Sequence, residues 1–365
     1  MKIVFCGGGT AGHITPALAI AQEVKKEYKD PKILFIGRNC GRENTLIEKE
    51  GYDLKTISIA GLQRKFTVKN LDVLKNTIRA YKRSKEILKE FNPDIVFGTG
   101  GYVCLPVIMA AKKIGIKTII HESNAIAGLT TKLLSAKVDK VLLNFEDAKN
   151  NLSKKATYAI VGNPINENFY KLKREEARRK LGLKEGDFFI LSFGGSLGSS
   201  KMNDVIITVM KRLSIKENSI THLHATGERY YKSIKEKNLT KENEKYKIVS
   251  FIEDISHKMP AADLVISRCG AMTISEICAS GVASILIPSP NVTDNHQLQN
   301  AKLLEKAKAA FIIEEEKVSA EDLEKLIITL KNNKFDRKNV AKNAKSLFLP
   351  NAAKLILKEI KSLTN

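Results

Sequence analysis

The sequence is poor in cysteine, and its cysteines are not spaced to bind a metal. Five cysteines occur in 365 residues, and no two of them form a Cys-x-x-Cys pair. They are Cys6, Cys40, Cys104, Cys269 and Cys278. Neither a disulfide framework nor a zinc site is therefore expected, and this usage is typical of a reducing compartment.

Long apolar runs are also missing. No stretch approaches the ~20 apolar residues that span a bilayer. The N-terminal segment MKIVFCGGG enters a strand pattern directly, without the apolar core of a signal peptide. Any membrane contact is therefore expected to be peripheral.

Acidic residues are too few to balance the charge. There are 40 Asp and Glu against 61 Lys and Arg, a formal net charge of +21. Such a field attracts phosphates, nucleic acids and anionic membranes, although a generally Lys-rich surface explains part of the excess equally well. Aromatic residues make up only 6%, and no zinc finger, RNA-recognition or helix-turn-helix signature is present. A nucleic-acid-binding module is therefore disfavoured.

The hydrophobic pattern predicts an α/β protein. Proline is scarce, with 9 residues, and 43% of the chain is hydrophobic, which excludes collagen-like and disordered chains. Short continuous apolar runs alternate with amphipathic segments, as in parallel sheets covered on both faces. The runs are KIVFC, KILFIG, DIVF, IKTII, VDKVLLN, DFFILSF, THLHAT, DLVIS, VASILIP and AAFIIE.

Two Rossmann-like, doubly wound lobes that face each other across a cleft are expected. The alternation restarts near Asp187, after a charged stretch that begins at Asn163 and has no strand pattern. We place the boundary near Gly162. The expected domains are residues 1–162 and 163–348, with an amphipathic helix at about 349–365 that packs back on the first domain.

A glycine-rich turn follows the first strand, and Gly7, Gly9 and Gly12 match G-x-G-x-x-G. Such turns let backbone N–H groups and a helix N-terminus approach an anion, but alone the pattern is weak evidence. The second strand ends in Gly37 and Arg38 instead of an acidic residue, which disfavours NAD and leaves NADP open.

Polar side chains follow several strands of the first lobe. His13 comes directly after the glycine turn and suits a general base, or else packs against that turn. Tyr102 follows a second glycine cluster, GTGGY. Glu122 and Asn124 end another strand, where they line a cleft, or else Glu122 and His121 only cap the next helix.

The second lobe has its own phosphate-type turn, GGSLG, which contains Ser196 and is followed by Asn203. Arg268 lies on a later turn, and Glu276 on the helix after it can accept both hydroxyls of a ribose, or is simply solvated. His222 and His224 lack a third ligand nearby, so no metal site is expected.

Six ordered motifs between about residues 3 and 301 resemble those of the MurG family, the bacterial GlcNAc transferases that convert lipid I to lipid II. They are GGGTAGHITPALAIA, GTGGYV, HESNAIAGLTTK, FGGSLGSSKMN, SRCGAMTISEICASG and DNHQLQNA. The resemblance implies the GT-B fold and inverting GlcNAc transfer from UDP-GlcNAc in peptidoglycan synthesis, without a cofactor or metal. Lipid I is the implied acceptor, at the cytoplasmic face of the plasma membrane.

The resemblance also implies roles for residues at matching positions. His13 is the implied base and Glu122 the second candidate for it. On the donor side, Ser196 and Asn203 lie near the diphosphate and sugar, Phe251 and Ile252 near uracil, Glu276 at the ribose and Gln297 at GlcNAc hydroxyls. The remaining substrate-binding positions are Thr10, Ala11, Gly12, Thr15, Tyr102 and Asn124.

Three positions depart from the family pattern. Ala11 and Leu197 stand where glycine and glutamine are usual, and Asn166 stands where an arginine is usual. The last two changes bear on how the diphosphate charge is neutralised, and Arg268 or Lys201 is the expected substitute.

A basic, amphipathic segment of the first lobe is a candidate membrane surface. Apolar residues at helical spacing lie among Lys and Arg between about residues 62 and 89, which suits an anionic leaflet. Without the family resemblance, the same pattern favours a core-facing helix with a basic outer face. The apolar members are Leu71, Leu74, Ile78 and Tyr81. Rival functions are another UDP-sugar enzyme of the same fold, such as a UDP-GlcNAc 2-epimerase, and an NADP oxidoreductase.

Overall fold

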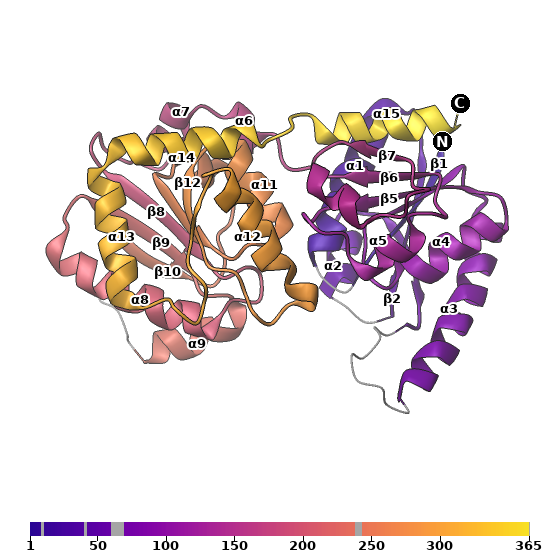
Figure 1. The fold of residues 1–365 in the computed structure, drawn as a ribbon, viewed down its shortest axis with the longest axis horizontal. Helices are drawn as coiled ribbons and strands as arrows, with labels where there is room; N and C mark the ends of the chain where they lie inside the picture. The colour runs from indigo at the N-terminus through magenta and orange to yellow at the C-terminus, as the bar shows by residue number, and fades with distance from the viewer. Residues whose placement is uncertain (9–10, 40–41, 60–68, 238–242, 365) are drawn as a thin grey trace. The chain divides into compact units, whose positions relative to one another are not determined.

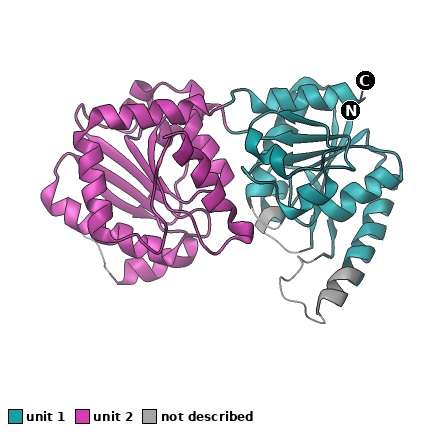
Figure 2. Cartoon of the chain, viewed as in Figure 1, with its two compact units in different colours: residues 1–165, 349–365 teal, residues 166–348 magenta. Residues whose placement is uncertain are grey.

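The computed structural model describes residues 1–8, 11–39, 42–59, 69–237 and 243–364. The chain forms two compact units, residues 1–165 with 349–365 (unit 1) and residues 166–348 (unit 2), as Figure 2 shows. This division lies three residues after the boundary placed at Gly162. That the two lobes face each other across a cleft stays a prediction.

Unit 1 is a seven-stranded parallel sheet with helices on both faces (Figure 1). The strand order is β3-β2-β1-β4-β5-β6-β7. The strands are β1 (Lys2–Cys6), β2 (Lys32–Arg38), β3 (Asp53–Ile57), β4 (Ile95–Gly98), β5 (Lys117–Glu122), β6 (Lys140–Leu143) and β7 (Tyr158–Ile160). The helices are α1 (Ala11–Glu27), α2 (Arg42–Lys49), α3 (Lys69–Phe91), α4 (Cys104–Lys113), α5 (Leu129–Leu134) and α15 (Ala352–Thr364), with a 3₁₀ turn at Glu146–Asn151.

Alternating side chains of the central strands form two separate cores, one on each face of this sheet. Val4 and Cys6 belong to the core beneath α3 and α4. Ile3 and Phe5 belong to the opposite core, beneath α1 and α15. Because every second residue of a strand points to the same face, a continuous apolar run is what a strand covered on both sides requires.

The last helix, α15, completes the core of unit 1. Ile356 and Ile360 are fully buried in the cluster that contains α1. Residues more than 300 positions apart in the sequence therefore share one core, and Figure 1 shows α15 lying along unit 1.

Unit 2 has a six-stranded parallel sheet of order β10-β9-β8-β11-β12-β13. Its strands are β8 (Phe188–Phe193), β9 (Ile220–Ala225), β10 (Tyr246–Val249), β11 (Leu264–Ser267), β12 (Ala283–Leu286) and β13 (Phe311–Ile312). Its helices are α6 (Asn168–Lys171), α7 (Arg174–Lys180), α8 (Ser200–Lys216), α9 (Glu228–Glu236), α10 (Ile255–Lys258), α11 (Ala271–Ser280), α12 (His296–Lys306), α13 (Ala320–Asn332) and α14 (Lys334–Ser346). Two 3₁₀ turns lie at Met259–Ala261 and Thr293–Asn295.

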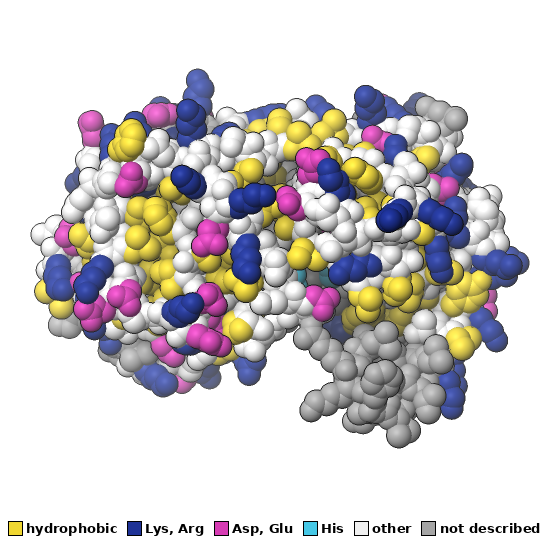
Figure 3. Space-filling view, in the orientation of Figure 1, with side chains coloured by type: hydrophobic (Ala, Val, Ile, Leu, Met, Phe, Trp, Pro, Cys, Tyr) yellow, Lys and Arg dark blue, Asp and Glu magenta, His cyan; other side chains and the backbone are white. Residues whose placement is uncertain are grey.

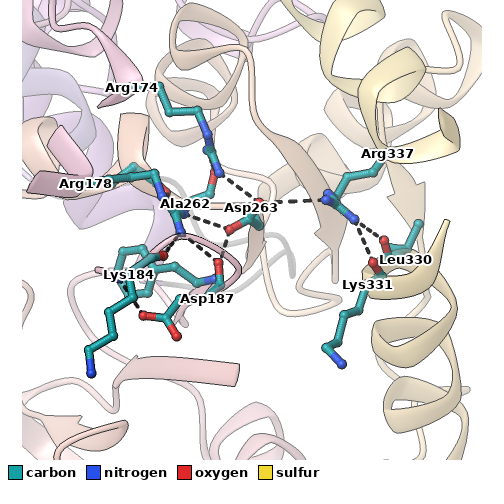
Figure 4. A network of polar contacts seen from close by, with 11 residues as sticks. Arg174, Arg178, Lys184, Asp187, Ala262, Asp263, Leu330, Lys331 and Arg337 are labelled. Atoms are coloured by element: carbon teal, nitrogen blue, oxygen red, sulfur yellow. Dashed lines mark hydrogen bonds and ion pairs between the residues drawn. The ribbon is translucent and has the colours of Figure 1, made fainter. Parts of the chain in front are cut away.

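Asp263 ties several elements together where the strands of unit 2 begin (Figure 4). Its carboxylate accepts a hydrogen bond from the Phe189 backbone N–H at 3.0 Å. It also pairs with Arg174 at 2.8 Å and Arg178 at 3.0 Å, and Arg337 of α14 lies 3.8 Å away. This network fixes the amino ends of β8 and β11. The loops with candidate site residues lie at the opposite, carboxyl ends of these strands.

Both sheets fit the predicted doubly wound architecture, in which ligands bind at the carboxyl ends of the strands. None of the helices among the described residues is long and apolar enough to cross a membrane.

Candidate functional site

His13 lies in the first turn of α1, and a hydrogen bond to its own loop fixes its ring. Nδ1 lies 2.9 Å from the carbonyl oxygen of Gly8. A carbonyl can only accept, so Nδ1 carries the proton and donates it. In the neutral imidazole, Nε2 therefore holds the lone pair. That nitrogen can accept a proton, as a general base must.

The ring of His13 lies against the turn that joins β4 to α4. A Cβ atom at Gly100 would lie 3.2 Å from the imidazole Cδ2. At Gly101, where φ is +79°, a Cβ would lie only 2.3 Å from the Gly8 oxygen. The two glycine-rich loops that the sequence singled out thus meet around His13, and side chains at these positions would displace its ring.

The remaining acceptor-side positions of the first loops differ in exposure. Gly12 and Thr15 are exposed on α1. Tyr102 is partly buried, and its hydroxyl oxygen accepts a hydrogen bond from Arg38 Nη1 at 3.3 Å. Arg38 therefore has a partner within unit 1. Thr10 lies outside the described residues, and only the backbone of Ala11 is described.

Glu122 is buried and organises its own loop. One carboxylate oxygen accepts hydrogen bonds from the backbone and side-chain nitrogens of Asn124, both at 3.1 Å. The other accepts from Gly128 N at 2.9 Å and from Thr131 Oγ1 at 2.7 Å. These bonds hold the start of α5, where a negative charge is favoured. The arrangement matches the helix-capping interpretation that the sequence left open.

Beside Glu122, the His121 ring is buried and holds the backbone at Gly162 by a hydrogen bond. Its Nε2 donates to the carbonyl of Gly162 at 2.9 Å. Burial lowers the pKa of His121, so the ring stays neutral near pH 7. His121 therefore braces the end of unit 1 where the chain leaves it.

In unit 2 the turn between β8 and α8 has the form of an anion site. Ser196 is exposed in this turn, and the side chain of Ser199 caps α8 by accepting a hydrogen bond from Met202 N at 3.4 Å. Helix α8 has 17 residues, and its N-terminus follows the turn. Backbone N–H groups and the positive end of the helix dipole favour a phosphate there.

Asn203 points into the protein. It is buried, its Nδ2 donates to the Thr226 carbonyl at 3.0 Å, and its Oδ1 lies 3.2 Å from His224 Nε2. The sequence places Asn203 beside the diphosphate, but both ends of its amide are already engaged. Its contribution to that turn is therefore indirect.

Arg268 is buried at the end of β11 and connects three segments. Its Nη2 donates to Ser199 Oγ at 2.5 Å and forms an ion pair with Glu315. Its Nη1 donates to the carbonyl of Ile287 at 3.1 Å. Arg268 thus contacts the cap of α8, but Glu315 compensates its charge.

Glu276 and Gln297 are both partly buried, and hydrogen bonds orient the Gln297 side chain. Glu276 lies on α11, and burial raises its pKa to about 8. The Gln297 Oε1 accepts hydrogen bonds from Cys269 N at 3.2 Å and Ser289 N at 2.9 Å. This fixes the amide so that its NH₂ group is the end left to face a ligand. Carboxyl groups with raised pKa values occur often at functional sites.

Phe251 and Ile252 follow β10 and have opposite environments. Phe251 is 57% exposed, whereas Ile252 is buried. An exposed ring at a strand end offers a face on which a base can stack. Among the residues the structure describes, no group of three or more His, Cys, Asp or Glu side chains is arranged to hold a metal ion.

Sequence reasoning missed several side chains that shape these turns. They are Ser199 and Glu315, which bind Arg268, and Thr226, which binds Asn203. Each contacts another candidate site residue. For Ser199 a signal existed, because a serine one residue before a helical pattern is a common N-cap. Glu315 follows the edge strand β13 and carries no motif.

Comparisons with known proteins agree over the whole chain. The model for the glycosyltransferase family 28 N-terminal domain matches residues 3–143, and that for the family 28 C-terminal domain matches residues 189–356. A UDP-N-acetylglucosamine–N-acetylmuramyl-(pentapeptide) pyrophosphoryl-undecaprenol N-acetylglucosamine transferase of Thermoanaerobacter sp. (strain X514) is 42% identical over the full length of both chains. The protein of the same name from Acetivibrio thermocellus is 40% identical and covers 100% of this chain and 98% of its own.

Solved structures give the same result. The crystal structure of MurG from Acinetobacter baumannii superposes with a TM-score of 0.79, at 28% identity over 99% of each chain. A putative UDP-N-acetylglucosamine 2-epimerase from Listeria monocytogenes reaches a TM-score of 0.69 at 17% identity, over 99% of this chain and 96% of its own, which shows the shared fold alone. The fold is the two-lobe α/β arrangement called GT-B, and this chain belongs to the MurG family within glycosyltransferase family 28.

Proposed function

We propose that this chain transfers GlcNAc from UDP-GlcNAc to the C4 hydroxyl of MurNAc in undecaprenyl-pyrophosphoryl-MurNAc-pentapeptide, the step from lipid I to lipid II in peptidoglycan synthesis. Membership of the MurG family supports it. The observation within the structure that carries it is the orientation of His13, whose Nδ1–H is held by Gly8. That bond leaves Nε2 as the proton-accepting nitrogen.

The reaction needs a base, because the attacking group is an alcohol. His13 Nε2 takes the proton of the C4 hydroxyl as its oxygen attacks the anomeric carbon of GlcNAc. The bond from that carbon to the UDP oxygen breaks, and the configuration inverts. The transition state resembles an oxocarbenium ion, as in other glycosyl transfers, and no covalent intermediate forms. General-base catalysis of this kind contributes about 10²- to 10⁴-fold.

Unit 2 holds the donor in this proposal. The turn at residues 194–199 and the N-terminus of α8 receive the diphosphate and stabilise the charge that develops on UDP. Glu276 accepts the ribose hydroxyls, and the ring of Phe251 stacks on uracil. Gln297 donates its NH₂ group to the sugar, because its oxygen is bound to two backbone N–H groups.

Unit 1 binds the lipid-linked acceptor from the cytoplasmic face of the plasma membrane, as a peripheral protein. Leu129 and Leu133 of α5 are 53% and 50% exposed, and Ile78 of α3 is 51% exposed. In Figure 3 hydrophobic side chains lie among Lys and Arg side chains on this part of unit 1. Apolar side chains ringed by basic ones suit an anionic leaflet. Tyr81 packs on the core instead, and the side chains of Leu71 and Leu74 lie outside the description.

The decisive experiment is incubation with UDP-GlcNAc and a lipid I analogue. We expect UDP release that requires both substrates. Conversion of UDP-GlcNAc to UDP-ManNAc without acceptor, or hydrolysis to UDP and free ManNAc, would reveal a 2-epimerase instead. A melting temperature raised by NADPH but not by UDP would indicate an oxidoreductase. NADP binding has little support, because Arg38 is bonded to Tyr102.

A further inference from the structure

Two histidines of β9 take no part in the proposed reaction. His222 and His224 are both fully buried, and their spacing of two places them on one face of the strand. Ser192 of the neighbouring strand β8 lies between their rings. Its Oγ is 2.7 Å from His222 Nε2 and 2.8 Å from His224 Nδ1. The hydroxyl thus links the two rings.

The direction of each hydrogen bond in this cluster follows from the Thr226 carbonyl, at the end of the series away from His222. The Thr226 carbonyl can only accept, so Asn203 turns its NH₂ group to it at 3.0 Å. Asn203 Oδ1 then faces His224 Nε2, which must carry the proton. His224 Nδ1 is left with a lone pair and accepts from Ser192 Oγ–H. The serine oxygen in turn accepts from His222 Nε2–H.

The alternative tautomer of His224 is disfavoured. It would let Nδ1 donate to the Ser192 carbonyl, which lies 3.2 Å away. It would also bring two acceptors together, Nε2 and Asn203 Oδ1, at 3.2 Å. Burial lowers the pKa of His224 to about 4 and that of His222 to about 3. Both rings are therefore neutral near pH 7, as a chain of alternating donors and acceptors requires.

The chain ends where two turns of unit 2 touch. A Cβ at Gly198, in the turn expected to receive the diphosphate, would lie 2.0 Å from the Thr226 carbonyl oxygen. A Cβ at Gly227 would lie 2.6 Å from Gly198 Cα. The bond from Asn203 to Thr226 therefore joins the first turn of α8 to the neighbouring turn, with Gly198 packed between them.

We propose that the ordered series His222, Ser192, His224, Asn203 and Thr226 is a positioning device for the diphosphate turn. His224 is its deciding member, because its Nε2–H donates to Asn203 Oδ1 and so holds the amide whose NH₂ group is bound to Thr226. The inference rests on the proposed function, in that the ligand of the turn is UDP-GlcNAc. None of these side chains contacts the substrate, and each acts through the backbone of residues 194–199 and 226–227.

The test compares variants of the full chain by calorimetric UDP binding and by steady-state kinetics. His224→Phe removes both ring hydrogen bonds at similar volume and leaves Asn203 held by its bond to Thr226 without a donor for its Oδ1. We expect the Kd for UDP and the KM for UDP-GlcNAc to rise about tenfold or more, with the KM for acceptor unchanged. His224→Gln, whose side-chain N–H can replace Nε2–H, restores part of the affinity.

Two further variants keep the test decisive. Ser192→Ala is a small change that releases the tautomer of His224, and we expect an intermediate rise in the UDP Kd. Ile220→Ala removes a fully buried side chain at the other end of the same strand. It lowers the melting temperature, but we expect its UDP Kd to match that of the unmodified protein.

Three outcomes would overturn the inference. One is His224→Phe and Ser192→Ala binding UDP as tightly as the unmodified chain. Another is Ile220→Ala weakening UDP binding as much as a network variant of equal melting temperature does. The third is an unmodified chain that fails to bind UDP, which would also remove the proposed function.

Discussion

At the scale of single residues, the proposed chemistry depends on which nitrogen of His13 holds a proton. The loop itself decides this, because the Gly8 carbonyl accepts from Nδ1 at 2.9 Å. A second residue, Glu276, has a proton affinity set by its surroundings, since burial raises its pKa to about 8. The loop thus sets the tautomer of His13. Burial leaves Glu276 largely protonated at pH 7, so it must lose one proton to become a carboxylate.

Replacing His13 by asparagine separates its two functions. The asparagine NH₂ group can take over the bond to the Gly8 carbonyl, but it provides no base. We expect His13→Asn to lower kcat by about 10²- to 10⁴-fold. The UDP Kd should not change, because the proposed donor site lies in unit 2. Rapid-quench measurement of a single turnover tests this, with His13→Ala as the variant that also loses the loop contact. Turnover close to that of the unmodified chain would refute the base assignment.

If Glu276 binds the ribose as proposed, UDP binding should depend on pH. The ionised carboxylate accepts the ribose hydroxyls better than the protonated acid, and its pKa of about 8 in the free protein leaves much of it protonated at pH 7. We therefore expect UDP affinity to increase as pH rises from 7 to 9, and proton release on binding at pH 7. Titration calorimetry in buffers of different ionisation enthalpy measures both effects.

Glu276→Gln is the control for that pH dependence. The amide cannot ionise, so binding should be weaker at pH 9 and its pH profile nearly flat over this range. The same substitution removes a destabilising group, since a raised carboxyl pKa costs stability as pH rises from about 4.5 towards 8. We expect a higher melting temperature at pH 8 in the absence of UDP. A slope identical to that of the unmodified chain would show that another group titrates.

The sequence predicts where the candidate site residues lie better than it predicts which partners their side chains bind. His13, Glu122 and Asn203 stand at strand ends or at the start of a helix, which the sequence pattern locates. Whether a side chain faces a ligand depends on partners supplied by turns that fold nearby. Four donors surround Glu122, and Thr226 together with His224 occupies Asn203. No motif encodes such contacts.

At the scale of elements, the two glycine turns differ from ordinary loops because backbone atoms approach them closely. Gly198 has φ +72°, and a Cβ there would meet the Thr226 oxygen at 2.0 Å. Gly186 has φ +89° with nothing within 4 Å of its Cβ position. Comparison of these two positions separates the cost of a left-handed backbone from the cost of a collision.

We expect Gly198→Ala to be far more harmful than Gly186→Ala. The φ preference alone costs roughly 1–2 kcal/mol at either position. At Gly198 the turn must also move away from Thr226, which disturbs the N-terminus of α8. Urea unfolding should show a larger stability loss for Gly198→Ala, and UDP binding should weaken in this variant only. Equal losses at the two positions would argue against close packing of the turns.

The strands that the hydrophobic pattern missed lie at the edges of the sheets. β3, β7 and β10 are absent from the predicted set, and each is an outermost strand. An edge strand has one neighbour and partly exposed side chains, so its sequence lacks the continuous apolar run of a central strand. DLKTI of β3 illustrates this, with Asp and Lys among its five residues. The central strands were all predicted.

At the scale of the whole molecule, we expect charge and exposed apolar side chains to govern the proposed membrane contact. The net charge is +21, and the exposed Leu129 and Leu133 flank Lys132 on α5. We expect binding to vesicles to increase with the fraction of anionic lipid and to weaken in high salt. Vesicle co-sedimentation across a series of phosphatidylglycerol contents measures this.

A double substitution tests the apolar contribution. Leu129→Ser with Leu133→Ser should lower vesicle affinity several-fold while UDP binding is unchanged. Ile215→Ser in unit 2 is the matched control, because Ile215 is 85% exposed and lies on a different unit. If the control weakens vesicle binding as much as the double variant, the contact is not specific to unit 1.

The return of α15 to unit 1 has a consequence for biosynthesis. Ile356 and Ile360 seal a core that begins with Ile3 and Phe5, while the whole of unit 2 lies between them in the sequence. A ribosome therefore finishes unit 2 before it delivers the last piece of unit 1. The nascent N-terminal half must wait with an open hydrophobic face, and a chaperone that shields such faces would be needed longest by the part of the polypeptide made first.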